Sequence, residues 1–165
     1  MVDDIAVVAG FKHELVEGEL NGRASIAINH AYAKTGVADS ARIGIGKYCG
    51  EVVVIDGDVL FTRANIERVI NTDGDLICVT PNISTSNPVF VEIESENVVG
   101  FTRDSRQLEW AGIGRFASRY LIDAHGYMCD ALADFLPMRW ELIDSIEIDT
   151  ADDLHEAEKW TARTE

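Results

Sequence analysis

Two short apolar runs that end in carboxylates constrain this chain more than any other feature. Residues 51–61 read EVVVIDGDVLF, and residues 145–153 read SIEIDTADD. Each run is rich in β-branched residues, which is typical of a buried strand. In open α/β sheets, ligands bind just beyond the carboxyl ends of the strands. The carboxylates that close each run therefore stand where a ligand would bind.

Those carboxylates are Asp56 and Asp58 in the first run and Glu147 and Asp149 in the second. Residues two apart on a strand face the same side, so Glu147 and Asp149 can point into one cleft. Mg²⁺ favours one or two carboxylates together with waters and substrate phosphates. We therefore predict that Asp58 and Asp149, assisted by Glu147, bind one Mg²⁺ for phosphoryl or nucleotidyl transfer.

Each strand end also has a simpler interpretation, which the local sequence leaves open. Residues 56–58 (Asp-Gly-Asp) also suit an ordinary acidic turn that caps the next helix. Asp149 also suits a cap for the last helix, together with Thr150. The recurrence of the same pattern at two strand ends is what favours the metal-site interpretation.

Length and composition place limits on the class of protein. A chain of 165 residues predicts a single domain over residues 1–165. No apolar run approaches the ~18–20 residues of a membrane span, and the acidic N-terminus is unlike a signal peptide. Three widely spaced cysteines favour reduced thiols over disulfides. We therefore expect a cytoplasmic protein without a membrane partner.

The net charge of −15 argues against nucleic acid as a partner, because a nucleic-acid binder normally shows a basic patch. The basic residues are ten Arg and only four Lys, and the acidic residues are spread along the whole chain. This composition suits a halophilic protein, because salt screens the self-repulsion of an acidic surface. An ordinary acidic protein from a low-salt cytoplasm is the alternative.

Strand and helix patterns alternate over most of the chain. Strands are expected at residues 5–10, 24–29, 52–55, 76–80, 89–94, 98–102, 110–116 and 146–148. Helices are expected at residues 12–20, 37–48, 63–70, 122–135 and after Thr150, and a polar loop at residues 81–88. This order predicts an α/β fold with a mixed, mostly parallel sheet and one antiparallel hairpin.

Other catalytic signals are weak. The four histidines are scattered, and none has a partner at ligand spacing, so we expect surface or capping roles for them. The chain has no glycine-rich phosphate loop and no GxSxG elbow.

Taken together, residues from about 3 to 160 resemble the sugar-phosphate and choline-phosphate nucleotidyltransferase family. DDIAVVAGFKHELVEGEL is similar to its second strand and helix, and INHAYAKTGVADSARI to its Asn-x-x-Tyr-x-x-Thr-Asn-Asn-x-x-Ser segment. VVVIDGDVLF is similar to the strand that ends in a metal-binding Asp, and LEWAGIGRF to the substrate-side strand. IEIDTADDLHEAEKW resembles the closing strand and helix, with the Glu-Ile-Asp ending of the choline-phosphate cytidylyltransferase-like members.

The resemblance implies a three-layer, Rossmann-like (GT-A-like) nucleotidyltransferase domain. It implies that a phosphorylated small molecule attacks the α-phosphate of a nucleoside triphosphate, with CTP as the candidate, and that pyrophosphate leaves. The residues carried over are Asp58 and Asp149 with Glu147 for Mg²⁺, Asn29, Thr35 and Ser40 near the nucleotide or acceptor, and Gly112 beside the acceptor.

Two departures from the family pattern matter. Gly36 and Val37 stand where the family usually has two asparagines. The family also begins with a strand and a glycine-rich loop carrying Arg and Lys, and this sequence starts after that loop. We therefore expect a fold truncated at its first strand.

The consequence for the sheet is that the strand at residues 5–10 must either pair with residues 52–55 or keep an open edge. Three hypotheses follow. The chain is a piece of a longer gene product; or a partner chain or a homo-oligomer completes the sheet; or the domain is a catalytically inactive structural or assembly protein.

Overall fold

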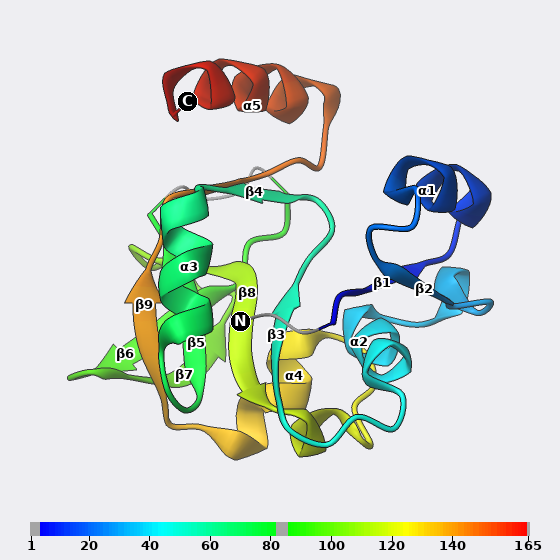
Figure 1. Ribbon diagram of the computed structural model, residues 1–165. Coiled ribbons are helices and arrows are strands. Elements are labelled where there is room, and N and C mark those ends of the chain that lie inside the picture. Colours follow the sequence, from blue (N-terminus) through cyan, green and yellow to red (C-terminus); the bar gives the residue numbers. More distant parts are fainter. Residues whose placement is uncertain (1–3, 82–85, 165) are drawn as a thin grey trace. The chain divides into compact units, whose positions relative to one another are not determined.

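The computed structural model describes residues 4–81 and 86–164, and strands alternate with helices along them as the sequence predicts (Figure 1). The chain divides into two units, Met1–Val52 with Ala117–Asp134 and Val53–Phe116 with Phe135–Glu165. Each unit is described by itself. None of the described helices has the length and apolar character needed to cross a membrane.

The first unit contains a short parallel sheet. Its elements are β1 (Ala6–Ala9), α1 (His13–Leu20), β2 (Ser25–Ile28), η1 (Tyr32–Lys34), α2 (Val37–Ile45), η2 (Ser118–Leu121) and α4 (Met128–Leu132). The β1–β2 ladder runs from Ala6↔Ser25 to Ala9↔Ile28. Asn21 closes α1 in a left-handed conformation, as expected for an Asn-Gly turn.

The second unit is built on a larger mixed sheet. Its elements are β3 (Glu51–Ile55), β4 (Val59–Phe61), α3 (Arg63–Asn71), β5 (Leu76–Thr80), β6 (Phe90–Glu94), β7 (Asn97–Thr102), β8 (Glu109–Ala117), η3 (Ala133–Phe135), β9 (Met138–Leu142), β10 (Ser145–Glu147) and α5 (Ala151–Thr164). The six-stranded sheet has the order β3-β8-β5-β9-β7-β6, and β4 and β10 form a separate ladder.

The α/β class and the mixed sheet are confirmed. β5, which is buried at every position, runs parallel to β9 and antiparallel to β8. The expected hairpin is present as β6 and β7, and β7 also pairs antiparallel with β9. Among the ladders of described residues, antiparallel pairing is thus more frequent than the sequence pattern indicated.

The core of the second unit explains the position of α3. Thr62 caps this helix by accepting a hydrogen bond of 3.2 Å from the backbone N–H of Asn65. Arg68 of α3 donates to Glu141 on β9 at 2.9 Å, which fixes the helix against the sheet. The apolar cluster beneath is formed by Val59, Val69, Leu76, Cys78, Ala111, Ile113 and Ile143.

The structure corrects three sequence-based expectations. The helix expected at residues 122–135 is limited to α4 and η3, because Gly126 has a φ of 74° and interrupts it. The strands β4 and β9 were not predicted. β4 has only three residues, and β9 reads MRWEL, in which two charges alternate with apolar residues. The polar loop expected at residues 81–88 lies partly outside the described residues.

Candidate metal centre

The β4–β10 ladder brings together the two strand ends that the sequence singled out. Its antiparallel register places Val59 opposite Glu147. Asp58 immediately precedes β4, and the backbone N–H of Ile148 donates to the carbonyl oxygen of Asp58 at 2.9 Å. Asp58 and Glu147 lie 89 positions apart in the sequence. The short strand β4, which the sequence did not predict, makes them neighbours.

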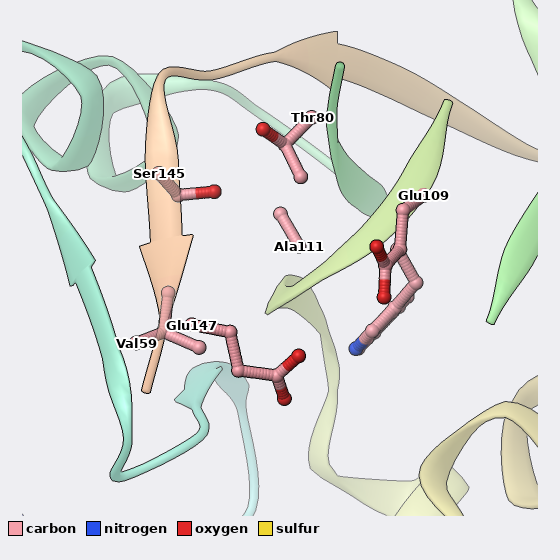
Figure 2. A pocket seen from close by; sticks show the side chains of 7 residues that line it. Val59, Thr80, Glu109, Ala111, Ser145 and Glu147 are labelled. Carbon is pink, nitrogen blue, oxygen red and sulfur yellow. The ribbon is translucent and has the colours of Figure 1, made fainter. Parts of the chain in front are cut away.

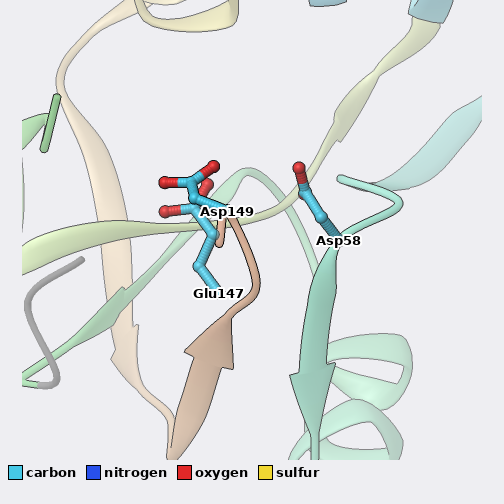
Figure 3. A group of neighbouring side chains, drawn as sticks. All are labelled: Asp58, Glu147 and Asp149. Carbon is cyan, nitrogen blue, oxygen red and sulfur yellow. The ribbon is translucent and has the colours of Figure 1, made fainter. Parts of the chain in front are cut away.

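The carboxylates at these ends form one cluster (Figure 3). Asp58, Glu147 and Asp149 each offer a carboxylate oxygen, and these oxygens lie within 4.8 Å of one another. Asp58 and Asp149 are exposed and Glu147 is half-buried. A set of oxygen donors at an open edge fits Mg²⁺, which keeps several waters and takes substrate phosphates as further ligands. The three predicted metal ligands are thus together in the structure.

Neither strand end is needed as a helix cap. At α5, the backbone N–H of Thr150 donates to Asp153 Oδ2 at 2.8 Å, and the N–H of Asp153 donates to Thr150 Oγ1 at 3.2 Å. This reciprocal pair is a capping box, so the Asp149 side chain is not required there. At α3, the cap is Thr62. The simpler interpretations of Asp58 and Asp149 are therefore disfavoured.

The electrostatics of the cluster favour a cation. The pKa of Asp149 is raised above its usual value, first by partial desolvation of its carboxylate and then by the negative charges of Asp58 and Asp153. The charges of Asp58 and Asp153 raise this pKa because they repel the ionised carboxylate of Asp149. A divalent cation between them would relieve that repulsion.

Asp56, two residues before Asp58, is in a more buried environment than the cluster. Burial is the main cause that raises its pKa to about 6, and the charge of Asp58 adds to it, while a hydrogen bond from the Trp110 side chain opposes the rise. The backbone N–H of Asp56 donates to the carbonyl of Gly112 at 2.8 Å. The sequence placed Asp56 beside the site but gave no sign of its raised pKa, which depends on residues from β8.

Gly112 has a structural requirement of its own. Its φ is +68°, and a Cβ built there would lie 2.9 Å from Val59 Cγ2 and 3.0 Å from Asp56 Oδ2. Only glycine suits this backbone conformation and this space. The expected approach of an acceptor at Gly112 stays a prediction.

A small hollow shares Glu147 with the carboxylate cluster (Figure 2). It is lined by Val59, Thr80, Glu109, Trp110, Ala111, Ser145 and Glu147, and its cavity volume of about 10 Å³ is room for about one water molecule. Thr80, Glu109 and Ser145 are buried polar residues. Glu147 belongs to both the hollow and the carboxylate cluster, so a water bound in the hollow would lie beside a cation bound by the cluster.

Three further predicted residues meet in the first unit. Asn29 is 2% exposed, and its Nδ2 donates to Thr35 Oγ1 at 2.9 Å and to Ser40 Oγ at 3.1 Å. Its Oδ1 accepts from the backbone N–H of Ala31 at 3.0 Å. These bonds use both amide hydrogens of Asn29, so the three side chains hold the segment between β2 and α2 in place.

The sequence did not predict a histidine–carboxylate pair in the same unit. The carboxylate of Asp39, 6% exposed, accepts from the backbone N–H groups of Gly126 at 2.9 Å and Gly36 at 3.0 Å. His125 Nδ1 lies 2.8 Å from Asp39 Oδ1. The hydrogen bond from Gly126, then those from His125 and Gly36, hold the pKa of Asp39 well below its usual range. Because 86 residues separate His125 from Asp39, spacing rules had no means of finding the pair.

The same contacts explain one departure from the family pattern. A Cβ at Gly36 would lie 2.1 Å from the carbonyl oxygen of Gly126. The Cβ of an asparagine at position 36 would therefore collide with backbone atoms of Gly126. Rotation of the asparagine side chain would not relieve this clash, because it does not move the Cβ.

Comparisons with known proteins show the fold. No protein-family model matches the chain, and no curated protein matches its sequence. Among solved structures, the chain is similar to the inositol-1-phosphate CTP transferase from T. maritima, with a TM-score of 0.79 and 15% identity. That match covers 99% of this chain and 77% of the other.

Two further structures are similar. The CTP:phosphocholine cytidylyltransferase from Streptococcus pneumoniae (LicC) has a TM-score of 0.74 and 15% identity, over 97% of this chain and 79% of that one. HddC from Yersinia pseudotuberculosis has a TM-score of 0.70 and 18% identity, over 96% of this chain and 79% of that one. The chain therefore has the Rossmann-like nucleotidyltransferase fold, which confirms the resemblance at the level of structure.

Proposed function

We propose that this protein is a Mg²⁺-dependent nucleotidyltransferase that acts on a nucleoside triphosphate and a phosphorylated small molecule. The observation that carries the proposal is the cluster of Asp58, Glu147 and Asp149, with oxygens within 4.8 Å of one another at the ends of two paired strands. CTP is the first candidate substrate, because two similar structures are described as a CTP transferase and a CTP:phosphocholine cytidylyltransferase.

The carboxylates of Asp58 and Asp149 would hold the cation, and Glu147 would fix its position relative to the hollow. When bound, Mg²⁺ supplies the charge neutralisation and the template for an in-line displacement. An oxygen of the acceptor phosphate forms a new bond to the α-phosphorus, the α–β bridging P–O bond breaks, and pyrophosphate leaves. The chain contributes to the rate mainly by positioning the two phosphates.

We propose that the acceptor binds at the surface beside Glu147, because the adjoining hollow itself has room for only about one water molecule. Gly112 lies on β8 next to Ala111, which lines the hollow. We propose that Gly112, which has no side chain, allows the acceptor to approach β8 closely.

In the first unit, the segment held by Asn29, Thr35 and Ser40 is proposed to contact the nucleotide or the acceptor. Because the Asn29 amide is already hydrogen-bonded to Thr35 and Ser40, we expect the segment to bind through its backbone and its exposed side chains. We also propose a cytoplasmic location, and adaptation to high salt for a chain with a net charge of −15.

The direct test is release of pyrophosphate from CTP, with Mg²⁺ and a panel of small phosphomonoesters that includes phosphocholine and inositol 1-phosphate. Asp58→Asn should abolish turnover without unfolding the protein. Asp104→Asn is the matched control, because Asp104 is an exposed aspartate of the same unit that lies outside the cluster. Its turnover should equal that of the parent chain.

If no combination of nucleoside triphosphate and acceptor released pyrophosphate, the result would favour the alternative function. In that case the same fold would serve a structural or assembly role without catalysis. Turnover that survives in Asp58→Asn would instead show that the reaction occurs elsewhere on the chain.

A further inference from the structure

The hollow that shares Glu147 with the carboxylate cluster lies where two ladders of the second unit meet. β10 belongs to the ladder with β4, whereas β5 and β8 belong to the six-stranded sheet. Ser145 and Glu147 stand two apart on β10, so their side chains face the same side of that strand. Figure 2 shows both side chains projecting toward the strand that carries Glu109 and Ala111. The hollow is thus bordered by side chains of β10 on one side and of β8 on the other.

Three of the side chains around the hollow are polar and deeply buried. Thr80, Glu109 and Ser145 are each at most 4% exposed. Thr80 stands directly opposite Glu109 in the β5–β8 ladder, so a hydroxyl and a carboxylate lie side by side. Each of these side chains also has interactions within the fold. A hydroxyl or a carboxylate has several lone pairs, however, and can bind a water as well as a protein group.

We propose that a water molecule in the hollow joins Glu109 to Glu147 and thereby fixes the Glu147 carboxylate in the position of a metal ligand. An ionised carboxylate only accepts hydrogen bonds, so Glu109 and Glu147 cannot bond to each other directly. A water has two hydrogens, one for each carboxylate, and its oxygen can accept a hydrogen bond from the hydroxyl of Ser145 or Thr80. These three bonds match the number that a buried water typically makes.

Glu109 becomes a positioning residue in this arrangement. The inference rests on the proposed function, in which Glu147 assists Asp58 and Asp149 in holding Mg²⁺. Glu147 is half-buried, and its long side chain loses rotamer freedom when it is fixed in one position. A hydrogen-bonded group behind a metal ligand supplies that fixation, and its loss typically lowers metal affinity about 10–100-fold. Glu109 therefore acts on the cation through the water and Glu147.

A crystal structure of the full chain in EDTA, at a resolution that shows ordered waters, tests the bridge directly. We expect a water within hydrogen-bonding distance of the carboxylates of Glu109 and Glu147. A hollow without water, or a water that contacts only one of the two carboxylates, would overturn the proposal. This observation needs no metal, so it decides the proposal even if the chain binds no Mn²⁺. That result would refute the metal centre of the proposed function and leave the water to be judged by the crystal structure.

Mn²⁺ binding to the full chain, followed by electron paramagnetic resonance, measures the effect on the metal ligand without turnover. Glu109→Gln and Glu109→Leu both remove the negative charge, so both change the long-range attraction of the cation equally. Glutamine keeps an acceptor oxygen for the water, and leucine does not. Mn²⁺ affinity should therefore be about tenfold lower in Glu109→Leu than in Glu109→Gln. Equal affinities in two variants that melt as cooperatively as the parent would overturn the proposal.

A second pair of variants places an atom in the hollow itself. Ala111 lines the hollow, and serine or cysteine at this position adds one heavy atom there. The serine hydroxyl can donate to Glu147 in the place of the water, whereas a cysteine thiol is only a weak donor. Ala111→Cys should therefore lower Mn²⁺ affinity, and Ala111→Ser should lower it less. If both variants bound Mn²⁺ as tightly as the parent, a water in the hollow would not position Glu147, and the proposal would be wrong.

Discussion

The backbone N–H of Ile148 donates to the carbonyl oxygen of Asp58 at 2.9 Å, and this bond extends the β4–β10 ladder beyond its last paired residues. It fixes the turn that carries Asp58 against the segment that carries Asp149. The geometry of the carboxylate cluster therefore depends on backbone pairing, and the side chains project from a rigid base.

Loss of one cluster carboxylate should change stability in opposite directions with and without metal. In EDTA, Asp149→Asn should raise the melting temperature slightly, because it removes repulsion from Asp58 and Asp153. With excess Mg²⁺ or Mn²⁺ the parent chain should gain stability by binding linkage, and Asp149→Asn should gain less. Differential scanning fluorimetry in both conditions measures the crossover. Equal metal-induced shifts in parent and variant would contradict the site.

Gly112→Ala should destabilise the second unit by about 1–3 kcal/mol, because an L-residue is strained at its positive φ and its Cβ would press on Asp56 and Val59. Urea unfolding measures the change. Gly57→Ala is the matched control, since a Cβ there would meet nothing within 4 Å. If both variants lost the same stability, the close packing of Gly112 against Asp56 would not be the cause.

Asp56 should make the metal-free protein less stable as the pH rises through the range from 4 to 6. Its pKa is raised to about 6 from 3.8, so the native state binds more protons than the unfolded state between these values. Above that window the penalty is about 3 kcal/mol, at about 1.4 kcal/mol per pKa unit. Asp56→Asn should remove much of this slope and raise the unfolding free energy at pH 7. Urea titrations from pH 4 to pH 7 in EDTA measure both.

Asp39 should affect the pH dependence of stability in the opposite direction to Asp56. Its pKa is lowered in the folded protein by hydrogen bonds from Gly126, His125 and Gly36, so its stabilisation is present above about pH 4 and is lost as the pH falls. Asp39→Asn should therefore lower stability at pH 7, with a smaller deficit at pH 3. His125→Ala should cost less than Asp39→Asn, because the two backbone donors remain. A pH-independent deficit for Asp39→Asn would contradict this account.

The sequence was sufficient for the strong local patterns. β3 and β5 were predicted because they are continuous β-branched and apolar runs, and α3 because Thr62 caps it. Asp58 and Asp149 were proposed as metal ligands because each follows such a run, and the structure brings their carboxylates together. These features depend on neighbours along the chain, which a pattern can show.

The features that the sequence missed depend on contacts between distant segments. β4 is too short to show a period, yet its pairing with β10 is what places Asp58 beside Glu147. The raised pKa of Asp56 needs the burial that β8 provides, and Asp39 needs a backbone N–H from Gly126. None of these partners lies within a helical turn or a hairpin of the residue it affects.

The most direct test of the proposed site is isothermal titration of the chain with CTP, and then with other nucleoside triphosphates, with and without Mg²⁺ in high salt. The account predicts triphosphate binding that requires Mg²⁺ and is lost in Asp58→Ala but kept in Asp104→Ala. Binding of no triphosphate, or binding that is unchanged in Asp58→Ala, would contradict it.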